Sequence, residues 1–97
     1  MIIVHDTFVC KPGNASKLAK LFKEWASQQK EVLHIMTDMT GQWHRIIVVS
    51  QYQNLSAYEK SWAKSMKDTP KNREMNKKFA NMNDLYMSGS REIYKVW

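Results

Sequence analysis

Hydrophobic and polar residues alternate along the first ten residues of the chain, but neither side of the alternation is polar. One side carries Asp6 among apolar residues: Ile2, Val4, Phe8 and Cys10. The other side carries His5 together with Ile3, Thr7 and Val9. A period of two with this content predicts a β-strand covered on both faces. The strand ends at Lys11-Pro12-Gly13, because proline has no N–H for the ladder and glycine accepts turn conformations.

The next segment changes to the spacing of a helix. Apolar residues recur every three or four positions: Ala15, Leu18, Ala19, Phe22, Trp25 and Ala26. This spacing predicts an amphipathic helix that packs one stripe against the sheet. Asn14 or Ser16 is the expected N-cap, since either side chain can accept a hydrogen bond from a free helix N–H.

A second and a third strand are predicted at residues 31–40 and 43–52. Gly41-Gln42 lies between them, and a Gly-X pair favours a tight two-residue hairpin turn. That turn sets a register of facing pairs: Thr40 with Trp43, Asp38 with Arg45, Met36 with Ile47 and His34 with Val49. The Asp38–Arg45 pair would then stabilise the hairpin by about 0.2–1 kcal/mol.

A longer helical region follows, with Asn54 or Ser56 as its expected N-cap. Its buried stripe is Leu55, Tyr58, Trp62 and Met66. Asp68-Thr69-Pro70 breaks the helix, and Pro70 can occupy the first turn of a new segment. The stripe of that segment continues through Met75, Phe79, Met82 and Tyr86. We expect Ser88-Gly89 to end the helical region and residues 91–97 to form the closing strand.

Strand, helix, hairpin, helix, strand is the element order of the ferredoxin-like βαββαβ fold, in the α+β class. We expect a four-stranded antiparallel sheet with the first and third strands lying parallel at its centre. Right-handed crossovers would place the helices on one face. The other face would then expose more apolar area than monomers tolerate. The pattern therefore predicts a homodimer whose sheets pair face to face.

The composition is typical of one soluble domain spanning residues 1–97. The chain is 43% hydrophobic and 25% charged, which excludes disordered and fibrous proteins. Its single cysteine, Cys10, excludes an internal disulfide and is read as a small buried strand residue. The amino end lacks the features of a signal peptide, and no apolar run is long enough to span a membrane. We therefore expect a cytoplasmic protein with no membrane partner.

The formal net charge of +6 comes largely from lysines at helical spacing. Such spacing is typical of the solvated face of an amphipathic helix, and attraction of an anionic partner is the alternative. RNA-recognition domains share this order of elements, but they need stacking aromatics and a Lys/Arg-Gly-Phe/Tyr signature on the third strand. Residues 43–50 lack that signature. We therefore expect no nucleic-acid partner.

No motif in the chain assigns a reaction. The three histidines, His5, His34 and His44, fall on three different strands, and the expected register points His34 and His44 to opposite faces. They are therefore not expected to share a metal ion. Glycine-rich phosphate loops, paired-cysteine zinc spacings and nucleophile elbows do not occur. We expect neither a metal nor a cofactor.

Three stretches carry a family resemblance: Cys10-Lys11-Pro12-Gly13 at the end of the first strand, the amphipathic helix after it, and Thr40-Gly41-Gln42-Trp43 at the hairpin. They resemble small dimeric α/β-barrel proteins, above all the NIPSNAP-like and antibiotic-biosynthesis-monooxygenase-like groups, over almost the whole chain. The resemblance implies a dimeric α/β barrel with a cavity between sheet and helices. Members of that superfamily include cofactor-free oxygenases, haem-degrading monooxygenases, isomerases and decarboxylases, and many have no assigned activity.

Haem-degrading members of this superfamily carry an Asn on the first strand, a Trp on the second helix and a haem-binding His about three turns later. In this chain Asp6 stands at the Asn position, Trp62 at the Trp position and Asn72 near the His position. Haem iron needs an axial donor such as imidazole. The resemblance therefore does not extend to haem degradation.

Asp6 is the candidate for chemistry that remains. A carboxylate among apolar residues on a central strand can abstract a proton from a small organic substrate. His5 is the second candidate base. The expected walls of a ligand pocket are aromatic: Phe8, Trp25, Tyr58 and Trp62. The alternative is that Asp6 pairs with Arg91 or Arg45 and holds the sheet in register.

Two classes of function stay open from the sequence. The first is a homodimer without catalysis that binds a small apolar ligand or has a structural role. The second is a cofactor-independent monooxygenase or isomerase that acts on a small aromatic or polyketide-like compound. In the second class Asp6 or His5 would be the base and Trp62 a pocket wall. The sequence leaves open whether the protein is an enzyme.

Overall fold

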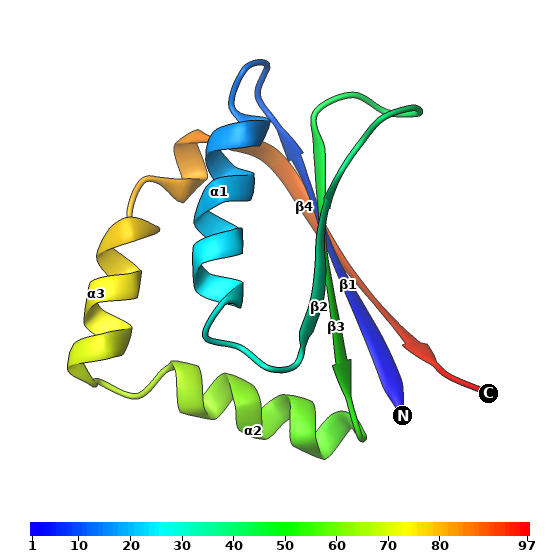
Figure 1. Cartoon of the computed structure of the whole chain (residues 1–97), viewed down its shortest axis with the longest axis vertical. Helices are drawn as coiled ribbons and strands as arrows, with labels where there is room; N and C mark the ends of the chain where they lie inside the picture. Colours follow the sequence, from blue (N-terminus) through cyan, green and yellow to red (C-terminus); the bar gives the residue numbers. More distant parts are fainter.

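The computed structural model describes residues 1–97. Its elements follow the chain as β1 (Ile2–Cys10), α1 (Ala15–Ala26), β2 (Val32–Thr37), β3 (Arg45–Tyr52), α2 (Leu55–Ser65), α3 (Pro70–Lys78), a 3₁₀ turn η1 (Met82–Asp84) and β4 (Tyr86–Lys95). One four-stranded sheet has the order β2-β3-β1-β4. All three α-helices lie on the same side of it (Figure 1). The predicted ferredoxin-like α+β fold is confirmed.

Each pair of neighbouring strands runs antiparallel, including β1 and β3 at the centre of the sheet. The predicted parallel arrangement of these two strands is wrong. The helix α1 returns the chain to the end of the sheet where β1 began, so β2 runs in the same direction as β1. The connection after β2 then reverses the chain, and β3 therefore meets β1 antiparallel.

The register of β2 and β3 agrees with the prediction, but their connection does not. His34 pairs with Val49 and Met36 with Ile47, as expected. Instead of a two-residue turn, residues 38–44 form a wider loop. Asp38 accepts a hydrogen bond from the backbone N–H of Arg45 at 2.8 Å, so the expected ion pair across the strands is replaced by a side-chain bond to the backbone.

The guanidinium of Arg45 stabilises this loop by donating hydrogen bonds to its backbone carbonyls. Its Nε donates to the carbonyl of Gln42 at 3.0 Å, and its terminal nitrogen donates to the carbonyl of Thr40 at 3.2 Å. Gly41 and His44 have positive φ angles of 90° and 63°. A positive φ is easy for glycine but uncommon for histidine. These contacts between side chains and backbone explain why the chain prefers the wide loop to the tight turn.

The predicted break between the second and third helices is confirmed. The Asn54 side chain caps α2 by accepting a hydrogen bond from Ala57 N–H, and Thr69 caps α3, in which Pro70 is at the first turn. Asn72 fixes the corner between the two helices, because its amide donates to the carbonyls of Lys64 and Lys67. None of the helices is long and apolar enough to cross a bilayer.

The last strand begins earlier than predicted. β4 starts at Tyr86 and already includes Ser88 and Gly89, which pair with Val9 and Phe8. Ser88-Gly89 therefore does not end a helix. The Tyr86 ring lies 5.2 Å from the Phe8 ring in an edge-on contact. Tyr86 therefore contacts the core as the first residue of β4 and not as the last residue of the predicted helical stripe.

The hydrophobic core is small and lies between α1 and the sheet. It consists of Cys10, Leu18, Phe22, Ile46 and Val48. The predicted stripe of α1 supplies Leu18 and Phe22, and this helix packs on β2 and β3. Only 8 of the 97 residues are buried in the single chain. Most of the apolar side chains are therefore partly open to water.

The single chain exposes more surface than a folded monomer of its mass. Its accessible surface is 7121 Å², whereas a monomer of 11.5 kDa is expected to expose about 5,800 Å². The excess is about 1,300 Å². Each partner in a standard protein interface buries about 800 Å². The exposed area is thus large enough for a stable interface.

Candidate functional site

Asp6 lies on the face of the sheet that the helices cover, because its neighbour on β3 is the core residue Val48. Directly opposite on β4 is Arg91. Arg91 Nε donates to Asp6 Oδ1 at 2.5 Å. This confirms the predicted alternative in which Asp6 pairs with Arg91. The side chains are 21% and 43% exposed, so water screens the pair and its contribution to stability is about 0–1 kcal/mol.

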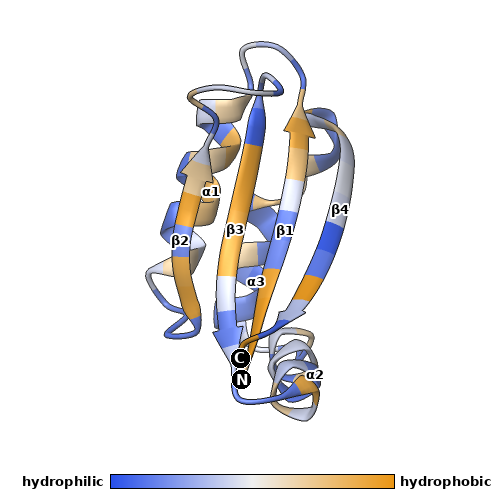
Figure 2. Cartoon of the chain, turned by 90° about the vertical axis from the view of Figure 1, so that its right-hand side faces the viewer, coloured by the Kyte–Doolittle hydropathy of each residue, from blue (hydrophilic) through white to orange (hydrophobic).

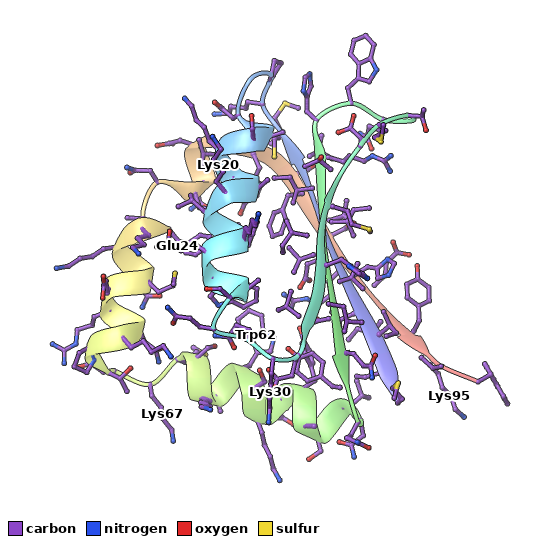
Figure 3. The ribbon with its side chains drawn as sticks, in the orientation of Figure 1. Lys20, Glu24, Lys30, Trp62, Lys67 and Lys95 are labelled. Carbon is purple, nitrogen blue, oxygen red and sulfur yellow. The ribbon has the colours of Figure 1, made fainter.

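The guanidinium of Arg91 also lies over aromatic rings of α2. Its central carbon is 4.9 Å from the centre of the Trp62 ring and 5.7 Å from that of Tyr58. Cations prefer such positions because the ring face is electron-rich. Figure 3 shows Trp62 on the side of α2 that faces the sheet and α1. Asp6, Arg91, Tyr58 and Trp62 thus form one group, which we call the Asp6 cluster.

The hydroxyl of Tyr58 is an unusual member of the Asp6 cluster. Its oxygen is buried and has no hydrogen-bond partner. Burial raises the pKa of Tyr58, and the neighbouring Trp62 and Arg91 offset this only in part. Tyr58 therefore remains a neutral phenol at physiological pH. A buried hydroxyl without a partner costs about 1–3 kcal/mol of folding free energy.

The other predicted site residues lie outside the cluster. Phe8 packs into the core against Phe22, with ring centres 5.1 Å apart, and the Trp25 ring centre lies 6.3 Å from that of Phe22. Both therefore pack against the core around Phe22. His5 lies on the opposite face of the sheet, with its ring edge-on to Tyr94 at 5.3 Å. The structure does not bring Asp6 and His5 together.

A hollow at the other end of the sheet was not predicted. It has a volume of about 320 Å³ and is lined by Ala15, Ser16, Thr37, Asp38, Trp43 and His44. It forms because the connection from β2 to β3 is a wide loop. The nearby Cys10 is free and fully buried. Burial, and to a smaller extent Asp38, raises the pKa of its thiol. This makes Cys10 a poor nucleophile.

We call the face of the sheet away from the helices the open sheet face. Residues that pair across neighbouring strands form rows on it, with one side chain from each strand. One row is His34, Val49, His5 and Glu92, and the next is Met36, Ile47, Thr7 and Ser90. Figure 2 views this face and shows hydrophobic stretches along β2, β3 and β1, whereas β4 is hydrophilic over much of its length. In these two rows the apolar residues are Met36 on β2 and Ile47 and Val49 on β3.

The residues of the chain do not fit a haem. The helix position of the haem-binding histidine is taken by Asn72, whose amide is engaged by the carbonyls at the end of α2. No histidine follows His44 in the sequence. No group of three histidine, cysteine, aspartate or glutamate side chains is placed to hold a metal ion.

Comparison with solved structures identifies the fold. A NIPSNAP family protein from Agrobacterium tumefaciens superposes with a TM-score of 0.80 at 15% sequence identity, covering 97% of this chain and 90% of that chain. An uncharacterised NIPSNAP-like domain protein from Burkholderia xenovorans gives 0.79 at 15% identity, covering 99% and 84%. A candidate antibiotic biosynthesis monooxygenase from Deinococcus radiodurans gives 0.63 at 17% identity, covering 100% and 93%.

This chain has the fold of the NIPSNAP proteins. The resemblance predicted from the sequence is confirmed at the level of the fold, including the similarity to antibiotic-biosynthesis-monooxygenase-like proteins. No family model matches the chain, and no curated protein matches its sequence. At these low identities the similarity defines the architecture, and the function has to be argued from the residues.

Proposed function

We propose that the protein works as a homodimer in which the open sheet faces of two copies pair as a dimeric α/β barrel. The observation that carries this proposal is the group of apolar residues Met36, Ile47 and Val49 on the uncovered face of the sheet. The surface of the single chain, about 1,300 Å² above that of a monomer of its mass, agrees with it. Two sheets packed about 10 Å apart would cover the apolar rows of both copies in one two-fold contact. The free, buried Cys10 suits the reducing cytoplasm, which is the location we propose.

Within each copy, the Asp6 cluster is the proposed binding site for a small, largely apolar organic ligand. Trp62 is 44% exposed although it faces the sheet. A partly open indole offers a flat surface for a planar ligand. The terminal nitrogens of Arg91 would supply donors for a ligand oxygen, because Arg91 uses only its Nε for Asp6. Phe8 and Trp25 would border the site from the core.

The alternative function is cofactor-independent oxygenation or isomerisation of a small aromatic or polyketide-like compound at the same site. A specific observation favours it: the Asp6 carboxylate lies within the same cluster as the exposed Trp62 surface. Asp6 would take a proton from a methylene carbon that is conjugated with a carbonyl group through aromatic rings, to form an enolate. In an oxygenation, dioxygen would place one oxygen atom on that carbon as a carbonyl, and the other would leave as water with the two hydrogens removed. His5, the second candidate base, would meet a ligand only between two copies.

Replacing Asp6 by asparagine separates the two functions. Asparagine keeps an oxygen that accepts from Arg91 Nε, but it cannot take a proton. We use anthrone as the probe, a planar aromatic ketone whose oxidation to anthraquinone is followed by absorbance. If the protein is an enzyme of this kind, Asp6→Asn lowers kcat/KM for anthrone by about 100-fold or more. Its binding of anthrone, measured by tryptophan fluorescence, stays within about two-fold, since the amide differs little in size.

The matched control is Asp68→Asn, the same chemical change at an exposed aspartate that pairs with Arg73 outside the cluster. Its turnover and binding should equal those of the wild type. Binding of anthrone without turnover in the wild type would contradict the enzyme function and support the binding function. Absence of binding up to the solubility limit of anthrone would contradict a site for planar aromatic ligands.

A further inference from the structure

Two of the three histidines of the chain lie on the open sheet face, in the same row across the strands. His34 on β2 and His5 on β1 both pair with Val49 of β3, which lies between them. The third histidine, His44, belongs to the loop before β3 and lines the hollow beside α1. A dimer that pairs the open sheet faces would therefore enclose His5 and His34 from both copies and leave His44 outside.

The charged surroundings of these two histidines are sparse. Glu92 on β4 is directly opposite His5, and its carboxylate accepts a hydrogen bond from the Tyr94 hydroxyl at 2.7 Å. Arg45 on β3 lies at the far end of the face. Its guanidinium donates to two loop carbonyls, and its backbone N–H donates to the Asp38 carboxylate. The remaining members of the two central rows are uncharged: Val49, Met36, Ile47, Thr7 and Ser90.

We propose that His5 and His34 make the pairing of two copies pH-dependent, so that mildly acidic conditions release the chains; this inference rests on the proposed homodimer. At pH 7.5 a histidine side chain is neutral and can be covered by a second sheet. Histidines titrate near pH 6.5. Below this pH, a protonated imidazole stays hydrated in the separate chain. In the dimer it would be held among Val49, Met36 and Ile47, close to the protonated imidazoles of the second copy.

The sign of the effect follows from these two states. Because the separate chains accept protons more readily than the dimer, dissociation takes up protons, and acid shifts the equilibrium toward monomers. Glu92 can stabilise a charged His5, but it lies at the opposite side of the row from His34. With one proton taken up per dissociation, the Kd rises about ten-fold per pH unit below the titration. Four enclosed imidazoles can only steepen this slope.

The test is sedimentation velocity of the full chain at pH 7.5 and pH 5.5, at several concentrations and constant ionic strength. The wild type should be a dimer at pH 7.5 and have a Kd about ten-fold higher or more at pH 5.5. For the double variant His5→Gln, His34→Gln, the Kd values at pH 7.5 and pH 5.5 should differ by less than about two-fold, since glutamine does not titrate. His44→Asn, which tolerates the positive φ at this position, is the matched control and should retain the pH dependence.

Far-UV circular dichroism at both pH values confirms that each protein remains folded. If the double variant does not fold, the Kd of His5→Gln and of His34→Gln is measured at both pH values, and each should depend on pH less than that of the wild type. A wild-type monomer at pH 7.5 would overturn the homodimer and this inference with it. A wild-type dimer with the same Kd at both pH values would overturn the histidine inference alone. Acid dissociation that persists in the double variant would overturn it too, because another group would then be responsible.

Discussion

Replacing Ile47 by glutamate is expected to convert the dimer into a monomer. Ile47 lies on β3 in the middle of the open sheet face, between Met36 and Thr7. In the proposed dimer, a carboxylate here would be removed from water without a cation to pair with. An uncompensated buried charge costs several kcal/mol, which raises the Kd by about 100-fold or more. Sedimentation velocity at micromolar concentration measures the change.

Leu55→Glu is the matched control for this prediction. Leu55 is 61% exposed at the start of α2, on the other side of the sheet. An acidic residue in the first turn of a helix is favourable, so Leu55→Glu should remain a dimer. If Ile47→Glu sediments as the wild type does, Ile47 is not in an interface, and the pairing of open sheet faces is contradicted.

The second large effect is expected in the core. Leu18→Ala should lower the free energy of unfolding by about 3 kcal/mol. Leu18 is fully buried on α1 and is one of the five residues that make up the core. Truncating it leaves a cavity between α1 and the sheet, because Leu18 packs there among Cys10, Phe22, Ile46 and Val48. Urea denaturation at one protein concentration measures the loss, since the stability of a dimer depends on concentration.

Met66→Ala provides the comparison for the core variant. Met66 caps the end of α2 and is 79% exposed. Its truncation should change the free energy of unfolding by less than about 0.5 kcal/mol. A change below about 1 kcal/mol for Leu18→Ala would mean that α1 does not close the core in solution.

The parts of the fold that could be predicted are those in which a regular pattern repeats. The stripe of α1 contains Leu18 and Phe22, which are the residues that the core buries. The register of β2 with β3 also follows from the sequence, because shifting a strand by one residue would reverse every side chain. Thr69-Pro70 marks the start of α3 because proline favours the first turn of a helix.

The errors lie where non-local contacts decide the conformation. Gly41-Gln42 reads as a tight turn, but Arg45 satisfies the carbonyls of a wider loop. Tyr86 fits the helical spacing after Met82, yet it begins β4 and contacts Phe8 from there. A residue whose position fits both the 3.6-residue period of a helix and the two-residue period of a strand cannot be assigned from spacing alone.

The candidate site could be predicted only in part for the same reason. Asp6 and its pairing with Arg91 were expected, and Tyr58 and Trp62 of the predicted α2 stripe lie against Arg91. The rest of that stripe was predicted wrongly, because Leu55 and Met66 are 61% and 79% exposed. That Arg91 joins these residues depends on the register of β4, whose start was predicted too late. The hollow beside Trp43 and His44 was not predicted, because it exists only if the connection is a wide loop.

The mass of the wild-type protein in solution decides whether two copies pair through their open sheet faces. Size-exclusion chromatography with light scattering at micromolar concentration and pH 7.5 should give about twice the chain mass of 11.5 kDa. A single species with the mass of one chain, unchanged at higher protein concentration, would exclude the homodimer, because the apolar residues of the open sheet face would then be exposed to water.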